Sequence, residues 1–247
     1  MKILVLGNSD TSGKFRPGPT WTQMVADGLR ERLDSGVELV NHPFTIIDAS
    51  SAAYAERRVR EAEPDLVLLP FGTMTFSVPF VWKRVERRLG KRAGQWYRKA
   101  EASFDRGVRE KGRLRDTIYR AAKRAAHLAL GAEPLSTRER VTEGMRALID
   151  AVARVENTQV VLIAAVSRGP QHEKPGARER RRAFLEEVRR AAGDRHFVFL
   201  DSDDAFPAEM TDLDVKNRDG LHQTSEAHRL LADFVLANLP ASIGALA

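Results

Sequence analysis

The 247 residues contain no cysteine. A disulfide framework, a thiolate metal site and a cysteine nucleophile are therefore all excluded. The sequence also lacks any window near the roughly 18 uninterrupted apolar residues that a membrane-spanning helix requires. It shows no basic segment followed by an apolar stretch and a small-residue cleavage site, so we expect no secretory signal. These absences favour a cytoplasmic protein without a membrane span.

Charge is abundant and unevenly distributed. The formal net charge is +6. Between Lys83 and Arg124 the sequence has 16 Lys and Arg residues against 5 Asp and Glu residues, which leaves the rest of the chain net acidic. This asymmetry is the main indication of an anionic partner.

Short apolar runs alternate with amphipathic helical stretches. The expected strands are Ile3–Leu6, Val37–Val40 together with Phe44–Ile47, Asp65–Leu69, Val160–Val166 and Phe197–Leu200. The expected helices are Thr20–Leu33 with Thr20 as N-cap, Tyr54–Glu63, Arg138–Glu156, Arg178–Ala192 and Ser225–Leu239. Strands that alternate with helices predict a three-layer α/β/α sandwich with a parallel sheet covered on both faces.

One segment interrupts this alternation. More than eighty residues separate the expected strands ending near Phe71 and beginning at Val160. Part of this span is the crossover helix, and the rest predicts a basic helical insertion at about residues 79–132 within a single domain of residues 1–247. Its aromatic and apolar residues are expected to pack it onto the body: Trp82, Val85, Leu89, Trp96, Tyr97 and Phe104.

Ser9 lies on the loop that leaves the first expected strand. Parallel sheets deliver functional residues at the carboxyl ends of their strands. Gly7 and Gly13 allow a tight turn there, whose backbone N–H groups can face a developing oxyanion. An ordinary turn leading into a capped helix explains the same residues. A phosphate-binding loop does not, because the Lys-Ser/Thr pair of a P-loop is missing after Gly13.

Asp219 and His222 lie three positions apart on a late loop. A serine needs a base to act as a nucleophile at neutral pH, and that base needs an orienting group. Asp219 can hold the imidazole while its other nitrogen faces Ser9. A turn with a solvated histidine is the alternative for this motif by itself. The occurrence of both motifs in one chain favours a serine-dependent hydrolase.

The two motifs resemble the first and last sequence blocks of the SGNH (GDSL-type) hydrolases. Residues 7–13 resemble Gly-Asp-Ser-x-Thr-x-Gly, with Asn8 in place of the Asp. Residues 219–228 resemble Asp-Gly-x-His-Pro-x-x-x-Gly-His, with Gln223 and Ala227 as departures and His228 as a structural histidine. The resemblance covers the chain apart from the helical insertion.

This resemblance implies a flavodoxin-like sandwich. No metal-ligand spacing and no Gly-rich cofactor motif is evident in the sequence, so we expect no cofactor and no metal. The resemblance implies that Ser9 is the nucleophile, His222 its base and Asp219 the partner of His222. It also implies hydrolysis of small-molecule acyl esters through an acyl-enzyme. An acyltransferase on the same triad stays open, because an alcohol can resolve the acyl-enzyme in place of water.

The oxyanion hole departs from the family pattern. Met74 occupies the position of the Asn in the third block, Gly-x-Asn-Asp, and a thioether donates no hydrogen bond. The second block lacks its Gly. The candidate donors are therefore Ser9, Ser50, Ser51, Thr73 and Thr75. These departures keep open a catalytically impaired binding protein that uses the basic insertion for an anionic partner.

The basic segment itself has two explanations. Arg and Lys interleaved with Trp96, Tyr97 and Tyr119 are typical of surfaces that bind nucleic acid or anionic lipid. A solvated helical face with local ion pairs accounts for the same composition, and we favour it. A lid over the active site is a third possibility.

Overall fold

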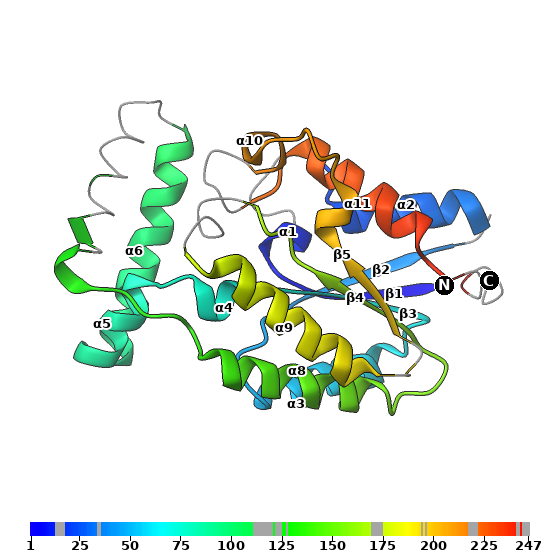
Figure 1. Ribbon diagram of the computed structural model, residues 1–247, viewed down its shortest axis with the longest axis horizontal. Coiled ribbons are helices and arrows are strands. Elements are labelled where there is room, and N and C mark those ends of the chain that lie inside the picture. The colour runs from blue at the N-terminus through cyan, green and yellow to red at the C-terminus, as the bar shows by residue number, and fades with distance from the viewer. Residues whose placement is uncertain are drawn as a thin grey trace. The chain divides into compact units, whose positions relative to one another are not determined.

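The computed structural model describes residues 1–12, 18–33, 36–110, 121, 125–126, 128–168, 175–193, 195, 197–216, 222–240 and 243 (Figure 1). Its centre is a parallel sheet of five strands in the order β2-β1-β3-β4-β5. The strands are β1 (Lys2–Gly7), β2 (Glu38–Pro43), β3 (Leu66–Phe71), β4 (Gln159–Ala164) and β5 (Phe197–Asp201). This is the flavodoxin-like strand order, so the predicted fold class is confirmed.

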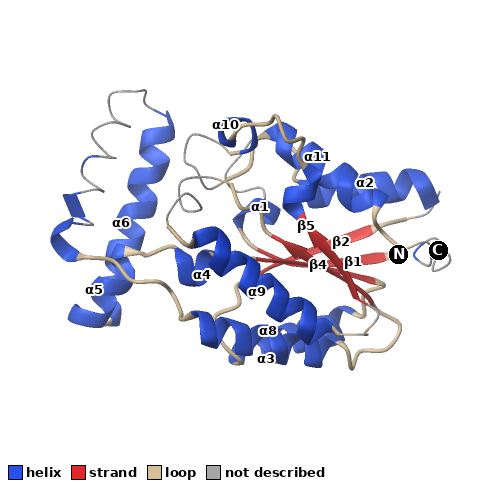
Figure 2. Cartoon of the chain, in the orientation of Figure 1, coloured by secondary structure: helices blue, strands red, loops and turns tan. Residues whose placement is uncertain are grey.

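Helices cover both faces of the sheet. The helices α2 (Trp21–Leu33) and α11 (Ser225–Ala237) lie on one face, and α3 (Ser50–Ala62), α8 (Arg138–Val152) and α9 (Ala177–Ala192) lie on the other (Figure 2). Shorter elements are α1 (Ser9–Ser12), η1 (Ser202–Ala205) and α10 (Asp212–Val215). No helix of the described residues is long and apolar enough to cross a membrane.

The hydrophobic core lies on both faces of the sheet, because successive side chains along each strand point to opposite faces. Ile3 and Val5 of β1 lie in one buried cluster with Trp21 and Val25 of α2 and Val235 of α11. The alternate residues of β1, Leu4 and Leu6, are equally buried. Successive strand side chains point to opposite faces, so those residues meet the other helical layer. Burial on both sides explains why the strands are continuous apolar runs.

Two local predictions had different outcomes. The hydroxyl of Thr20 accepts from the N–H of Gln23, and the side chain of Gln23 accepts from the N–H of Thr20 at 2.7 Å. This reciprocal capping box confirms Thr20 as the start of α2. The expected strand Phe44–Ile47 is wrong, because β2 ends at Pro43 and those residues form a loop.

The chain divides into two compact units. The first comprises Met1–Thr73 and Arg138–Ala247, and the second Met74–Thr137. Within the second unit lie α4 (Met74–Ser77), α5 (Val81–Leu89) and α6 (Lys91–Glu110). A two-way backbone bridge between Phe80 and Glu133 closes this unit, with N···O distances of 2.7 and 3.1 Å.

Two of the apolar residues that the sequence suggested for packing the insertion have largely exposed side chains. Leu89 and Trp96 are each 72% exposed.

Gly144 on α8 yields a stability prediction. A Cβ atom there would lie 2.6 Å from the carbonyl oxygen and 2.7 Å from the carbonyl carbon of Asp48. An exposed helical Gly→Ala change ordinarily stabilises by about 1 kcal/mol. We expect Gly144→Ala to destabilise the protein instead, by about 1–3 kcal/mol, since backbone atoms cannot move aside easily.

Urea denaturation measures this effect, and Gly28→Ala on α2 is the matched control. The Cβ there would meet only the end of the flexible Leu236 side chain, at 2.6 Å. We expect the control to be near neutral. A Gly144→Ala protein as stable as the wild type would show that α8 does not press on the Asp48 loop.

Candidate active site

The candidate site lies at the carboxyl edge of the sheet, where β1 and β3 end side by side. Ser9 follows β1 and Thr73 follows β3. The order of strands reverses between β1 and β3, and open α/β sheets bind ligands at such a switch point. The topology therefore brings the serine loop to the usual place for chemistry in this fold.

The serine loop is held by local hydrogen bonds. The side chain of Asn8 accepts from the N–H of Asp10 at 3.0 Å, and its carbonyl accepts from the Thr11 hydroxyl at 2.8 Å. Asn41 of β2 donates to the carbonyl of Thr11. A Cβ at Gly7 would lie 2.3 Å from the Thr11 hydroxyl oxygen, so only glycine fits there. Ser9 is the first residue of α1, and its side chain lies outside the described part of the structure.

The late loop begins and ends on a backbone pairing. Lys216 and Gln223 form an isolated antiparallel bridge, and the N–H of Thr224 donates to the carbonyl of Val215 at 3.0 Å. The Thr224 hydroxyl accepts from the N–H of Ala227 and so caps α11. His222 directly precedes this bridge and is partly buried. Asp219 lies outside the described residues.

Within the described residues, a hydrogen bond joins the two motifs. The backbone N–H of Gln223 donates to the carboxylate of Asp10 at 3.4 Å, across 213 positions of sequence. Asp10 follows Ser9 in the chain, and Gln223 follows His222. The structure therefore brings the serine segment and the histidine segment together.

The second histidine of the late motif has a different environment. His228 on α11 is buried, and its Nδ1 accepts from the backbone N–H of Trp21 at 3.0 Å. An accepting Nδ1 carries no proton, so a neutral imidazole here bears its proton on Nε2. This hydrogen bond links α11 to the first turn of α2, so the role of His228 is structural.

Two of the candidate oxyanion donors are already engaged. The N–H of Ser50 donates to the carboxylate of Asp48 at 3.0 Å, and the N–H of Ser51 donates to the Asp48 carbonyl at 3.1 Å. The Ser50 hydroxyl also donates to Asp48 and, with the Ser50 N–H, lowers the pKa of that carboxyl group. These bonds close the first turn of α3. Either amide would have to leave Asp48 before it could donate to a substrate.

The candidates near the third block lie in different units. Thr73 is the last residue of one segment of the first unit and is 6% exposed. Thr75 belongs to the second unit, where its carbonyl accepts from the N–H of Ser136 at 3.2 Å. Met74 is 41% exposed.

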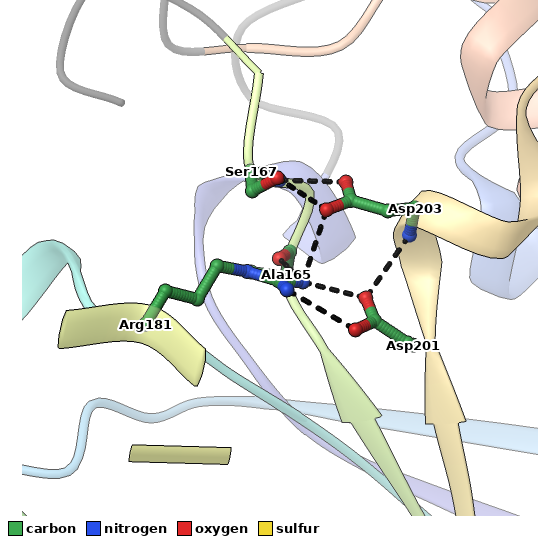
Figure 3. Close-up of polar contacts among 5 residues, drawn as sticks. All are labelled: Ala165, Ser167, Arg181, Asp201 and Asp203. Atoms are coloured by element: carbon green, nitrogen blue, oxygen red, sulfur yellow. Dashed lines mark hydrogen bonds and ion pairs between the residues drawn. The ribbon is translucent and has the colours of Figure 1, made fainter. Parts of the chain in front are cut away.

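A largely buried charge network at the same edge of the sheet is not evident from the sequence. Arg181 of α9 makes a two-pronged ion pair with Asp201 at the end of β5, with N···O distances of 2.5 and 3.1 Å (Figure 3). Its guanidinium also donates to the carbonyl of Ala165 at 3.0 Å and lies 3.4 Å from Asp203. The Arg181 and Asp201 side chains are only 11% and 15% exposed.

This network fixes the loop that leaves β4. Asp203 accepts from both the N–H and the hydroxyl of Ser167 (Figure 3). The N–H of Ala165 donates to the carbonyl of Phe71, two residues before Thr73. Arg181 therefore holds the chain segment that pairs with the end of β3. The sequence gives little indication of this role for Arg181, because Arg181 is one of several arginines in a helix whose composition is typical of a solvated surface.

The match of the sequence to a protein-family model shows which family the chain belongs to. The model of the GDSL-like Lipase/Acylhydrolase family matches residues 5–230. The chain belongs to this family. The match runs from β1 into α11 and therefore includes both sequence motifs. This GDSL-like protein thus belongs to the broad class of hydrolases.

Solved structures of esterases and acylhydrolases share the fold at low identity. A Clostridium thermocellum family 3 carbohydrate esterase has a TM-score of 0.56 and 14% identity, with 100% of this chain and 98% of that chain covered. An acetyl xylan esterase, AlAXEase, has a TM-score of 0.57 and 16% identity, with 97% and 100% covered. The lipase/acylhydrolase of Enterococcus faecalis has a TM-score of 0.55 and 14% identity, with 99% and 96% covered. No curated protein matches the chain significantly in sequence.

Proposed function

We propose that this GDSL-like protein is a serine-dependent carboxylic ester hydrolase with Ser9 as nucleophile, His222 as general base and Asp219 as the partner of His222. The observation that carries the proposal is the hydrogen bond from Gln223 to Asp10, because it joins the segments that bear the base and the nucleophile. Membership of the family supports the same reaction class.

The proposed reaction has two halves. The Ser9 hydroxyl oxygen attacks the ester carbonyl carbon while His222 takes its proton, and His222 then gives that proton to the departing alkoxide. Water attacks the acyl-enzyme with His222 again as base, which releases the acid and restores Ser9. Asp219 stabilises the imidazolium that forms in each half.

The oxyanion needs donors that are not already committed. Ser50 and Ser51 donate to Asp48, which makes them weaker candidates than the sequence suggested. We propose the backbone N–H of Ser9 and a donor at Thr73 as the main contributors. Thr73 lies two residues after Phe71, whose carbonyl accepts from the N–H of Ala165, and Arg181 in turn donates to the carbonyl of Ala165.

The proposed substrates are esters of small or medium acyl groups. Two of the similar structures are named as a carbohydrate esterase and an acetyl xylan esterase. Acetylated carbohydrates therefore belong in the substrate panel beside p-nitrophenyl esters of increasing chain length. A cytoplasmic location stays a prediction of the sequence.

A fluorophosphonate probe tests the nucleophile directly. We expect the wild-type protein to be labelled, Ser9→Ala not to be labelled, and His222→Ala to be labelled much more slowly because the serine has lost its base. Circular dichroism establishes that each variant is folded. A folded wild-type protein that takes no label would favour the impaired binding protein.

Asp10 provides a test of how the two motifs are joined. We expect Asp10→Ala to lower kcat about tenfold, because small displacements of catalytic groups are costly to the rate. Asp10→Asn keeps an oxygen that can accept from Gln223 and should stay within about threefold of the wild type. Steady-state hydrolysis of p-nitrophenyl acetate measures both. Equal losses in the two variants would mean that the charge of Asp10 matters rather than this bond.

A further inference from the structure

Exposed apolar side chains gather in the second unit. Six large apolar side chains of the described residues are exposed, and five of them belong to this unit: Met74, Leu89, Trp96, Leu128 and Leu130. The same unit contains the whole basic segment from Lys83 to Arg124. Exposed apolar groups set among positive charges are unusual on a solvated face, and such patches commonly mark interaction sites.

The packing of α6 on α5 decides which residues face outward. Gly94 is buried where the helices meet, and a Cβ there would lie 2.5 Å from the Cβ of Glu86. Residues of an α-helix are about 100° apart, so Arg92, Trp96 and Lys99 lie about 140–200° around α6 from Gly94. All three are exposed, on the face turned away from α5.

The turn between the helices carries further exposed residues. Leu89 continues the spacing of the buried Val81 and Val85, yet it is exposed because α5 ends at Gly90. Arg88 and Lys91 flank this turn and are also exposed. We call the exposed residues of this turn and of the outer side of α6 the α5–α6 basic face: Arg88, Leu89, Lys91, Arg92, Trp96 and Lys99.

The two acidic side chains that the structure describes in this unit, Glu86 and Glu133, pair with other cations. Glu133 pairs with Arg84 and Arg87, and Glu86 lies 3.6 Å from Lys83. Arg98 lies over the ring of Trp82 at 5.3 Å. As far as the structure describes this unit, the four cations of the α5–α6 basic face form no ion pair. They are therefore available to an external anion.

We propose that the α5–α6 basic face binds the surface of a bilayer that contains anionic phospholipid. Lysine and arginine are attracted to the negative surface, and tryptophan and leucine enter the headgroup and upper acyl region. A second copy of this chain fits poorly, because a symmetric contact would bring like charges together. Nucleic acid fits the charges and Trp96 but offers no apolar environment to Leu89.

Sedimentation with lipid vesicles tests the proposal. Vesicles of phosphatidylcholine alone are compared with vesicles in which about one third of the lipid is phosphatidylserine. We expect binding to the anionic vesicles only. Replacement of Arg88, Lys91, Arg92 and Lys99 with glutamine should weaken it about a hundredfold or more, since each cation near an anionic surface contributes about fivefold.

The matched control removes the same charge from the first unit. Arg178, Arg180, Arg182 and Arg190 are exposed on α9, and their replacement with glutamine should change binding by less than about threefold. Equal losses in the two variants would mean attraction by net charge alone and would overturn the proposal. None of these residues belongs to the proposed catalytic machinery.

Insertion is tested with lipids brominated on their acyl chains, which quench nearby tryptophan. We expect quenching in the wild type and its loss in Trp96→Phe, which keeps an apolar ring and should still bind. Absence of quenching, or no sedimentation with anionic vesicles, would contradict the proposal. Tighter binding to single-stranded RNA or DNA than to the vesicles at equal phosphate concentration would assign the face to nucleic acid instead.

Discussion

Replacement of Ser9 with alanine is expected to lower kcat for p-nitrophenyl acetate hydrolysis by at least about 10⁴-fold. In serine hydrolases the loss of the nucleophile removes the covalent route, and only binding and oxyanion stabilisation are left. Since Ser9 is the first residue of a short helix whose turn is held by Asn8 and Thr11, alanine should leave the fold intact.

Two further variants make this result interpretable. His222→Ala should give a loss of similar size, and the Ser9→Ala/His222→Ala double variant should be little worse than either, because the members of a triad act as a unit. Additive losses would indicate that the two residues act independently. If Ser9→Ala keeps more than about a tenth of the wild-type kcat, the assignment of the nucleophile is wrong.

Replacement of Arg181 with methionine is expected to lower the free energy of unfolding by about 3–5 kcal/mol. The change leaves the nearly buried carboxylate of Asp201 without its partner, and removing one member of a buried ion pair has effects of this size. It also removes the donor to the carbonyl of Ala165. Urea denaturation followed by circular dichroism measures the loss.

Matched variants separate this pair from a general effect of charge. Arg178→Met removes an exposed arginine of the same helix and should change stability by less than about 0.5 kcal/mol. Asp201→Asn combined with Arg181→Met should cost less than the sum of the single changes, because the two groups interact. A loss below about 1 kcal/mol for Arg181→Met would show that the pair is not held as the structure describes it.

Most strands could be predicted because their signal is local. A strand that is buried on both faces of a sheet is a continuous run of apolar residues, which can be recognised from the local sequence alone. For this reason four of the five strands were located to within about two residues of their ends. Phe44–Ile47 has the same composition without being a strand. Phe44 stacks on Tyr54 of α3, with ring centroids 6.0 Å apart, so a loop buries it.

The site residues could be proposed from their chemistry, but their environment could not. Ser50 and Ser51 were reasonable oxyanion donors as long as the position of Asp48 was unknown. In the sequence, Arg181 cannot be distinguished from its neighbours Arg180 and Arg182. The orientation of α9 on the sheet decides which of the three arginines faces Asp201. Burial of a single side chain depends on what packs against it.

The sequence by itself determined the strand and helix content, the parallel sandwich, and the two motifs that bear Ser9 and His222. Only the tertiary structure decided that Gln223 bonds to Asp10, that Arg181 is largely buried, and that Trp96 is exposed. The physical reason is the same in each case. Strand and helix patterns arise from neighbours in sequence, whereas hydrogen-bond partners and burial are set by contacts between residues that are distant along the chain.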